Sequence, residues 1–282
     1  MSKVIGLRTL FTAAVAAVWP ALVAHATVYK SIPCENATID NATWNITQTI
    51  GGVNTVYVSE HGLGEPTKPA FSTGFYRGAN CLAIAMNAHP VEVAPDGNRR
   101  DRNEYVLMNE SETNTLRFNN LPRYTGFAYM KHTTSVTPNP DNTIIYQVWQ
   151  GSPHSPIIYF TEDPDGMLRL YVRNDSVGGN ALVTPSILLW EEDIANNEWN
   201  TFVIYQRLGY SGNGQIALWW NGTKVVDTVM SLGYKPQSAG GMTGALDSCR
   251  VKFGMYQGRP NTFHKYFFDE IKFTNVYTEA VP

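Results

Sequence analysis

The chain has 282 residues, of which 43% are hydrophobic and 12% aromatic, and its formal net charge at pH 7 is −3. This balance gives no general attraction to polyanions, so any basic site has to be local. A nucleic-acid-binding protein is thereby disfavoured.

The N-terminus has the features of a secretory signal peptide. Lys3 precedes an apolar run over residues 10–23, and Ala24-His25-Ala26 supplies the small residues of a cleavage site. The run is shorter than the roughly 20 apolar residues of a membrane-spanning helix. We therefore predict a signal peptide over residues 1–26, no membrane anchor, and a secreted, extracellular protein whose mature chain is residues 27–282.

The mature chain has the pattern of an all-β protein. Apolar residues alternate with polar ones, or form short β-branched and aromatic runs, between clusters of Gly, Pro, Asn and Asp. Strands are predicted at 53–59, 80–87, 104–108, 116–118, 126–132, 143–149, 157–161, 168–173, 201–206, 215–220, 224–229, 250–256 and 266–275. Residues 191–197 are predicted to form a short helical turn. So many regularly spaced strands are typical of two packed antiparallel sheets.

Turn residues support several of these strand connections. Asp163-Pro-Asp-Gly166 is a turn sequence, and Asn221-Gly222 is typical of a tight hairpin between 215–220 and 224–229. No low-complexity linker divides the mature chain, and single sandwich domains commonly reach roughly 200–250 residues. We therefore predict one domain.

Cysteines and sequons also indicate the secretory route. Three cysteines, Cys34, Cys81 and Cys249, predict one disulfide and one spare thiol, and we prefer a Cys34–Cys249 bridge. None is spaced as zinc ligands usually are. Six Asn-x-Ser/Thr sequons are potential glycosylation sites: Asn36, Asn41, Asn45, Asn109, Asn174 and Asn221.

Arg102 and Glu104 are the first pair of candidate functional residues. They lie two positions apart in a predicted strand and therefore on one face of it. A carboxylate beside a guanidinium holds it in an orientation suited to binding another carboxylate. Taken alone, a solvated basic loop paired with its own acid is the simpler interpretation.

Two further strands carry polar residues on a single face. Gln147 and Trp149 share a face of an otherwise apolar strand, where an amide can donate to a ligand and an indole can stack on a sugar ring. Lys252, Gly254 and Tyr256 share a face of a later strand, and Gly254 leaves room beside the phenol. The alternative for the first strand is a Gln that faces solvent, and for Tyr256 it is ordinary core or rim packing.

The order of these segments resembles that of known sugar-acting families. The stretches 198–205 and 214–222 resemble the back sheet of concanavalin-like β-jelly rolls. The three polar strands are similar to the Arg-x-Glu, Gln-Ile/Val-His and Tyr-Phe-Lys-Ala-Gly-Val/Ile-Tyr strands of alginate lyases. The ends of fungal glucuronan lyases and heparin-lyase-like enzymes resemble 252–256 and 266–273 here. The resemblance covers about 80–273 and implies a jelly-roll polysaccharide lyase.

One departure from the alginate lyases affects the expected substrate. Trp149 stands where those enzymes have a His, which favours the glucuronan lyases. A catalytic His has then to be sought among the histidines outside this strand. His154 is the first choice and His89 the second, ahead of His61, His132 and His264.

The resemblance also implies a mechanism. β-Elimination removes the proton at C5 of a uronate, and the adjacent carboxylate has to be neutralised first. Arg102 and Gln147 would neutralise it, with His154 as a further donor or as the base. Tyr256 would act as general base, general acid or both. The substrate-binding residues would be Glu104, which orients Arg102, together with Trp149, Lys252, Gln257, Arg259 and His89.

The expected partner is an acidic polysaccharide, most specifically β-1,4-glucuronan, bound by a monomer. No cofactor and no catalytic metal is expected, and the sequence leaves open whether a structural calcium ion binds. A lectin-type binding protein and an alginate-specific lyase remain alternatives. A glycoside hydrolase is disfavoured because 191–193 and 269–270 lack the alternating carboxylates of laminarinase-like enzymes.

Overall fold

The computed structural model describes residues 28–32, 34–35, 37–43, 45–50, 53–57, 59–61, 66–72, 76–86, 100–108, 123–132, 142–150, 155–174, 185–234, 249–258 and 263–282. Within these ranges the only helix is the short α2 (Tyr277–Ala280). None of the described helical residues forms a segment long and apolar enough to cross a membrane. The predicted signal peptide and the predicted strand at 116–118 lie outside the described residues.

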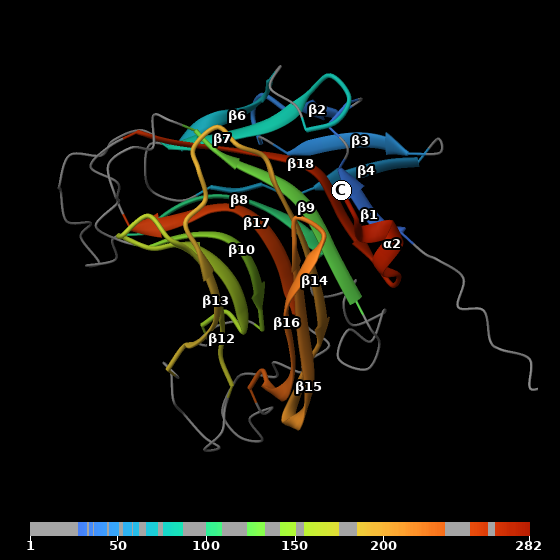
Figure 1. Ribbon diagram of the computed structural model, residues 1–282. Helices are drawn as coiled ribbons and strands as arrows, with labels where there is room; N and C mark the ends of the chain where they lie inside the picture. The colour runs from blue at the N-terminus through green and yellow to red at the C-terminus, as the bar shows by residue number, and fades with distance from the viewer. Residues whose placement is uncertain are drawn as a thin grey trace, which may run out of the picture.

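Two large antiparallel sheets form the body of the protein (Figure 1). The eight-stranded back sheet has the order β16-β15-β14-β9-β18-β7-β6, with β1 paired to β18. Its strands are β1 (Val28–Ile32), β6 (Pro66–Ser72), β7 (Cys81–Met86), β9 (Arg123–Lys131), β14 (Asn200–Arg207), β15 (Gly209–Trp220), β16 (Thr223–Leu232) and β18 (His264–Thr274).

The seven-stranded front sheet has the order β13-β12-β11-β10-β17-β8-β5. Its strands are β5 (Ser59–His61), β8 (Arg100–Met108), β10 (Thr143–Trp149), β11 (Ile158–Glu162), β12 (Leu168–Val172), β13 (Ile187–Glu192) and β17 (Arg250–Gly258). A smaller sheet contains β2 (Ala37–Ile39), β3 (Ile46–Ile50) and β4 (Val53–Tyr57). Tyr57 of β4 ties this sheet to β1, because its hydroxyl donates to the carbonyl of Ser31 at 2.7 Å.

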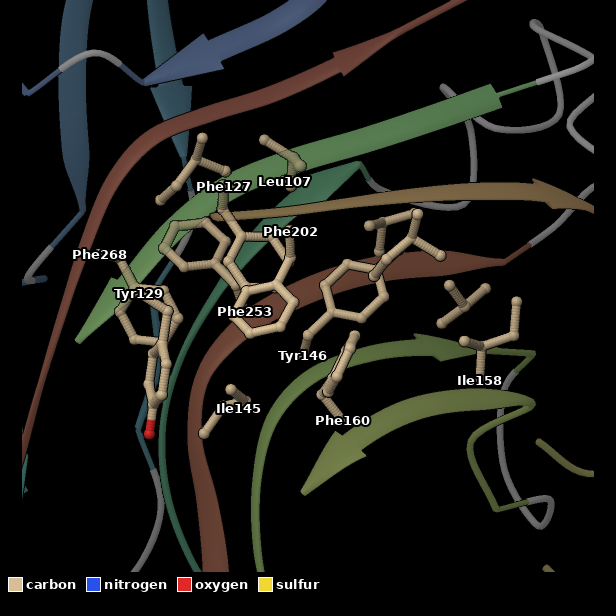
Figure 2. Close-up of a cluster of buried hydrophobic side chains, with 14 of the residues drawn as sticks. Leu107, Phe127, Tyr129, Ile145, Tyr146, Ile158, Phe160, Phe202, Phe253 and Phe268 are labelled. Carbon is tan, nitrogen blue, oxygen red and sulfur yellow. The ribbon is translucent and has the colours of Figure 1, made fainter. Parts of the chain in front are cut away.

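The hydrophobic core lies between the front and back sheets (Figure 2). The ring of Phe127 in the back sheet lies 5.7 Å from Tyr146 in the front sheet and 5.5 Å from Phe202. The buried Tyr146 hydroxyl donates to Gln206 Oε1 at 3.0 Å and lies 3.1 Å from Thr125 Oγ1. The inward-facing side chains of both sheets therefore follow the two-residue period of a sandwich. The polar side chains of Tyr146, Gln206 and Thr125 in the core form hydrogen bonds with one another across the two sheets.

Most of the predicted strands are confirmed within one or a few residues, and the two turns are confirmed as well. The amide of Gly166 donates to the carbonyl of Asp163 at 2.8 Å. Asn221 and Gly222 have φ angles of 48° and 79° and form the tight turn between β15 and β16. These positive φ values are those of a type I′ hairpin.

The predicted helical turn at 191–197 is wrong. Glu191 and Glu192 end the unpredicted strand β13, which pairs with β12 so that Glu191 lies opposite Arg169. Arg169 Nε lies 2.9 Å from Glu191 Oε2. The pairing with β12, which the local sequence does not reveal, decides that this segment is a strand.

The predicted Cys34–Cys249 disulfide is not formed: none of Cys34, Cys81 and Cys249 is disulfide-bonded, and all three are buried. Cys34 Sγ lies 3.9 Å from the carbonyl oxygen of Phe268 in the back sheet. Cys249 instead directly precedes β17 of the front sheet. The two thiols thus lie next to strands of different sheets.

Candidate active site

The outer face of the front sheet carries the candidate site. On β17, Val251, Phe253 and Met255 point into the core. Lys252 and Tyr256 alternate with them and therefore lie on the opposite face. Tyr146 and Val148 of β10 likewise belong to the core, which places Gln147 and Trp149 on the same outer face.

Glu104 and Gln147 meet across an intervening strand. They belong to β8 and β10, which flank β17 in the sheet, yet Gln147 Nε2 donates a hydrogen bond to Glu104 Oε1. Glu104 and Gln147 are 0% and 3% exposed, so this contact is shielded from water. Such a buried, charge-assisted hydrogen bond holds both side chains in one orientation.

Gly254 lets the backbones of β17 and β8 approach closely at Glu104. It is the register partner of Glu104 and has a φ of +135°. A Cβ at this position would lie 2.4 Å from the carbonyl oxygen of Asn103 and 2.7 Å from Glu104 Cα. Only glycine fits this backbone, for both conformational and steric reasons.

Arg102 links the buried pair to Tyr256. Its Nε lies 3.3 Å from Glu104 Oε2, and the side chains of Arg102 and Glu104 are 33% and 1% exposed. Its Cζ lies 4.7 Å from the ring centroid of Tyr256, which is its register partner on β17. The contacts therefore run from Tyr256 through Arg102 and Glu104 to Gln147, and the guanidinium reaches the surface.

Two cations approach the ring of Trp149. Lys252 Nζ is 4.7 Å and Arg250 Cζ is 5.5 Å from the centroid of its ring. Lys252 is 1% exposed and is the register partner of Gln147. The indole that stands where alginate lyases have a His therefore lies in a local basic cluster and makes cation–π contacts with it.

The expected histidines are not found on this face among the described side chains. His154 and His89 lie outside the described residues, as does Arg259, and the side chains of His61 and Gln257 are not described. His132 follows β9 of the back sheet, with its ring 5.7 Å from that of Phe267. His264 begins β18 of the back sheet and is 1% exposed. Burial lowers the pKa of the His264 imidazole to about 4.

The structure adds residues that sequence analysis did not single out. Tyr159 of β11 is the register partner of Gln147, and its ring stacks on Tyr171 of β12 at 5.3 Å. Arg173 Cζ lies 4.4 Å from the centroid of Tyr159. A tyrosine or arginine in a strand carries no motif of its own. The only sequence signal was the alternation of Leu168, Leu170 and Val172 with polar residues, which places Tyr171 and Arg173 on one face.

These features define a concanavalin-like jelly roll with an arginine, a carboxylate, an amide and a phenol in one chain of contacts on a sheet face. The sequence matches the polysaccharide lyase family over residues 41–272, and the chain belongs to this family. The protein is therefore a polysaccharide lyase, and the resemblance seen in the sequence is confirmed.

Solved structures with related folds include two lyases. The endo-β-1,4-glucuronan lyase from the fungus Trichoderma reesei matches with a TM-score of 0.64 at 13% sequence identity, covering 91% of this chain and 99% of that chain. The alginate lyase PA1167 from Pseudomonas aeruginosa matches with a TM-score of 0.47 at 15% identity, covering 84% and 100%. No curated protein matches the sequence. The first likeness supports the jelly-roll fold.

Proposed function

We propose that this lyase cleaves β-1,4-glucuronan by β-elimination on the outer face of its front sheet. The observation that carries the proposal is the contact chain in which Glu104 orients both Arg102 and Gln147 beside Tyr256. The glucuronan lyase among the related structures supports the choice of polymer. Trp149 in place of the His of alginate lyases favours the same choice.

Arg102 and Gln147 neutralise the carboxylate of the uronate that loses its C5 proton. The amide of Gln147 has two N–H donors, and Glu104 takes one of them. The other donor and the exposed part of the Arg102 guanidinium serve the substrate. Because Glu104 holds both groups before substrate arrives, little reorganisation is needed as negative charge spreads from C5 into the carboxylate.

Tyr256 transfers the proton. As a phenolate it takes the proton from C5, the electron pair of the C5–H bond forms the C4–C5 double bond, and the C4–O4 bond breaks. The resulting phenol then protonates O4 of the leaving chain, so base and acid are one residue. His154 or His89 would add a donor to the carboxylate or share the role of base.

The neighbouring residues bind the rest of the polymer. Trp149 offers an aromatic surface to a sugar ring, and Lys252 contributes positive charge beside it. Gln257, Arg259 and His89 would contact adjacent uronates. The proposed mechanism needs no cofactor, and the described residues contain no cluster of three or more His, Cys, Asp or Glu that could hold a metal ion.

We further propose that the protein is secreted as a glycosylated monomer. Among the described sequons, Asn41 and Asn221 are exposed. Asn221 Oδ1, however, accepts the amide of Thr201 at 2.8 Å and thereby fixes the hairpin turn. Asn41 Oδ1 also accepts a hydrogen bond, from Lys68 Nζ, but a glycan attaches to Nδ2, and the Nδ2 of Asn221 donates to Asn200 Oδ1 at 3.1 Å. Asn41 is therefore the better glycosylation acceptor. Mass spectrometry of the secreted protein before and after N-glycan removal tests the cleavage after Ala26 and these sites together.

The lyase activity is tested with three polymers. Glucuronan, alginate and heparin-type chains are incubated separately with the protein, and the ultraviolet absorbance of the 4,5-unsaturated uronate is followed. We expect a rise with glucuronan that is lost in Tyr256→Phe and retained in Tyr205→Phe, a control on β14 of the back sheet. Binding without any rise in absorbance would leave a lectin-type protein instead.

A rise with alginate alone would contradict the glucuronan assignment.

The lectin alternative already meets one difficulty, because Gln147, Lys252 and Tyr256 share one outer face. A binding module has no need for this convergence.

A further inference from the structure

Arg173 differs from Arg169, on the same outer face, in its counter-charges. It follows β12, and its position continues the alternation that puts Arg169 and Tyr171 outside. Arg169 pairs with Asp163 at 2.8 Å, Asp165 at 2.6 Å and Glu191 at 2.9 Å. Within the described part of the chain, no carboxylate lies within ion-pair distance of Arg173.

The guanidinium of Arg173 retains hydrogen-bond donors. An arginine has five N–H donors, and the only side-chain hydrogen bond found for Arg173 in the described ranges is Nη1 to the carbonyl of Pro156 at 3.1 Å. The Nε atom is buried without an acceptor there. The side chain as a whole is only half-buried, so the Nη donors remain for a ligand.

The position of Arg173 is fixed by its surroundings. Its amide donates to Ile157 at 2.7 Å, and its carbonyl accepts from Gly233 at 3.2 Å. The guanidinium stacks on Tyr159, whose hydroxyl donates to Ser186 Oγ at 2.6 Å. Tyr159 is itself 5% exposed, so it supports the guanidinium rather than offering a free stacking face.

Arg173 and Gln147 lie on the same face of the front sheet, two strand positions apart. Tyr159 of β11 is beside Gln147 of β10, and β12 is the next strand. Tyr171 of β12 is the register partner of Tyr159, and Arg173 lies two residues beyond it. Neighbouring strands are about 4.8 Å apart and a strand rises about 3.4 Å per residue, so Arg173 lies on the order of 12 Å from Gln147. This separation places Arg173 beyond the sugar whose carboxylate Gln147 and Arg102 would hold.

We infer that Arg173, stacked on Tyr159, binds the carboxylate of a second uronate further along the substrate chain. The inference rests on the proposed function, and it makes the enzyme selective for polymers that carry acidic groups on more than the cleaved residue. A preoriented guanidinium loses little freedom on binding, and its planar fork suits a carboxylate.

The test compares Arg173→Ala and Arg173→Lys with Arg207→Ala. Arg207 is a half-buried arginine at the end of β14 in the back sheet and serves as the matched control. Losing a charge-assisted hydrogen bond should raise KM for glucuronan about tenfold or more while kcat stays within about twofold. Arg173→Lys should recover part of the loss, because an ammonium keeps the charge but not the fork.

Oligoglucuronates of defined length separate binding from a general loss of structure. The ratio of kcat/KM between the wild type and Arg173→Ala should approach one for oligomers too short to reach Arg173, and grow with length. An equal loss at all lengths, or a KM like that of Arg207→Ala with an active enzyme, would overturn the inference.

Binding measured without turnover distinguishes the two proposals. In Tyr256→Phe, calorimetry should show weaker glucuronan binding when Arg173→Ala is added, and the difference should shrink as salt is raised. If the wild type cleaves no polymer, the proposed function fails. Equal glucuronan affinity with and without Arg173 then overturns the subsite as well. A loss seen only with sulfated heparin-type chains would also overturn it, because the site would then recognise sulfate.

Discussion

Glu104 on β8 accepts a hydrogen bond from Gln147 on β10 even though β17 lies between the two strands. The same carboxylate lies 3.3 Å from Arg102 Nε. One buried anion therefore positions two donors for the substrate carboxylate, and its removal should affect catalysis more than binding.

Glu104→Gln tests this role. The substitution keeps the size of the side chain but removes the charge that orients Arg102. We expect kcat on glucuronan to fall by about 10–100-fold with a smaller change in KM, as for the loss of preorganised electrostatic stabilisation. Glu279→Gln on the exposed part of α2 is the control. Unchanged kcat in Glu104→Gln would show that Glu104 plays no part in the reaction.

Gly254→Ala should destabilise the protein as well as inactivate it. The new Cβ would approach backbone atoms at 2.4 Å and 2.7 Å, at a φ of +135°. We expect a loss of about 1–3 kcal/mol in the free energy of unfolding, measured by denaturant titration. Gly212→Ala is the control, since it also has a positive φ of 82° but its Cβ meets nothing within 4 Å. Equal losses in both variants would remove the steric part of the argument.

His264 should make the protein less stable in mild acid. Burial lowers the pKa of its imidazole from 6.5 to about 4. Between these values the unfolded chain binds a proton that the folded chain does not, so stability falls as pH falls through this window. Unfolding midpoints measured from pH 7 to pH 4 should decline less steeply in His264→Gln. Parallel declines in both proteins would mean that this histidine does not contribute.

Asp269 should have the opposite effect over a similar range. Burial raises the pKa of its carboxyl from 3.8 to about 6, against the amides of Arg77, Glu270 and Tyr76, which lower it. Here the folded chain binds the proton more tightly, so this contribution to stability is present at pH 4 and is lost as pH rises through 6. Asp269→Asn should lack this contribution. The same titration measures it, and identical pH dependence in the two proteins would contradict the assignment.

The three thiols should react with Ellman's reagent only after unfolding. All three cysteines are buried and none is disulfide-bonded, and burial raises the pKa of Cys34 well above its ordinary value. Thiolates are the reactive form, so the native protein should react slowly. Denaturant without reductant should release all three. Release of a single thiol per chain would demonstrate a disulfide and reinstate the earlier expectation.

The sequence by itself determined the all-β class, most strand positions and the segments that carry Arg102, Gln147 and Tyr256. These features follow from local rules, because a two-residue period and turn residues are visible in a short stretch of chain. The order of these segments along the chain carried the resemblance to lyases.

Only the tertiary structure decided how these residues meet. The pairing of Glu104 with Gln147 depends on β8, β17 and β10 being neighbours, and these strands come from distant parts of the chain. The edge strand β13 and the free state of Cys34 depend on partners in the same way. Arg173 stands apart from Arg169 only because carboxylates surround one and not the other among the described residues. Such relationships arise from long-range strand pairing, which no local pattern encodes.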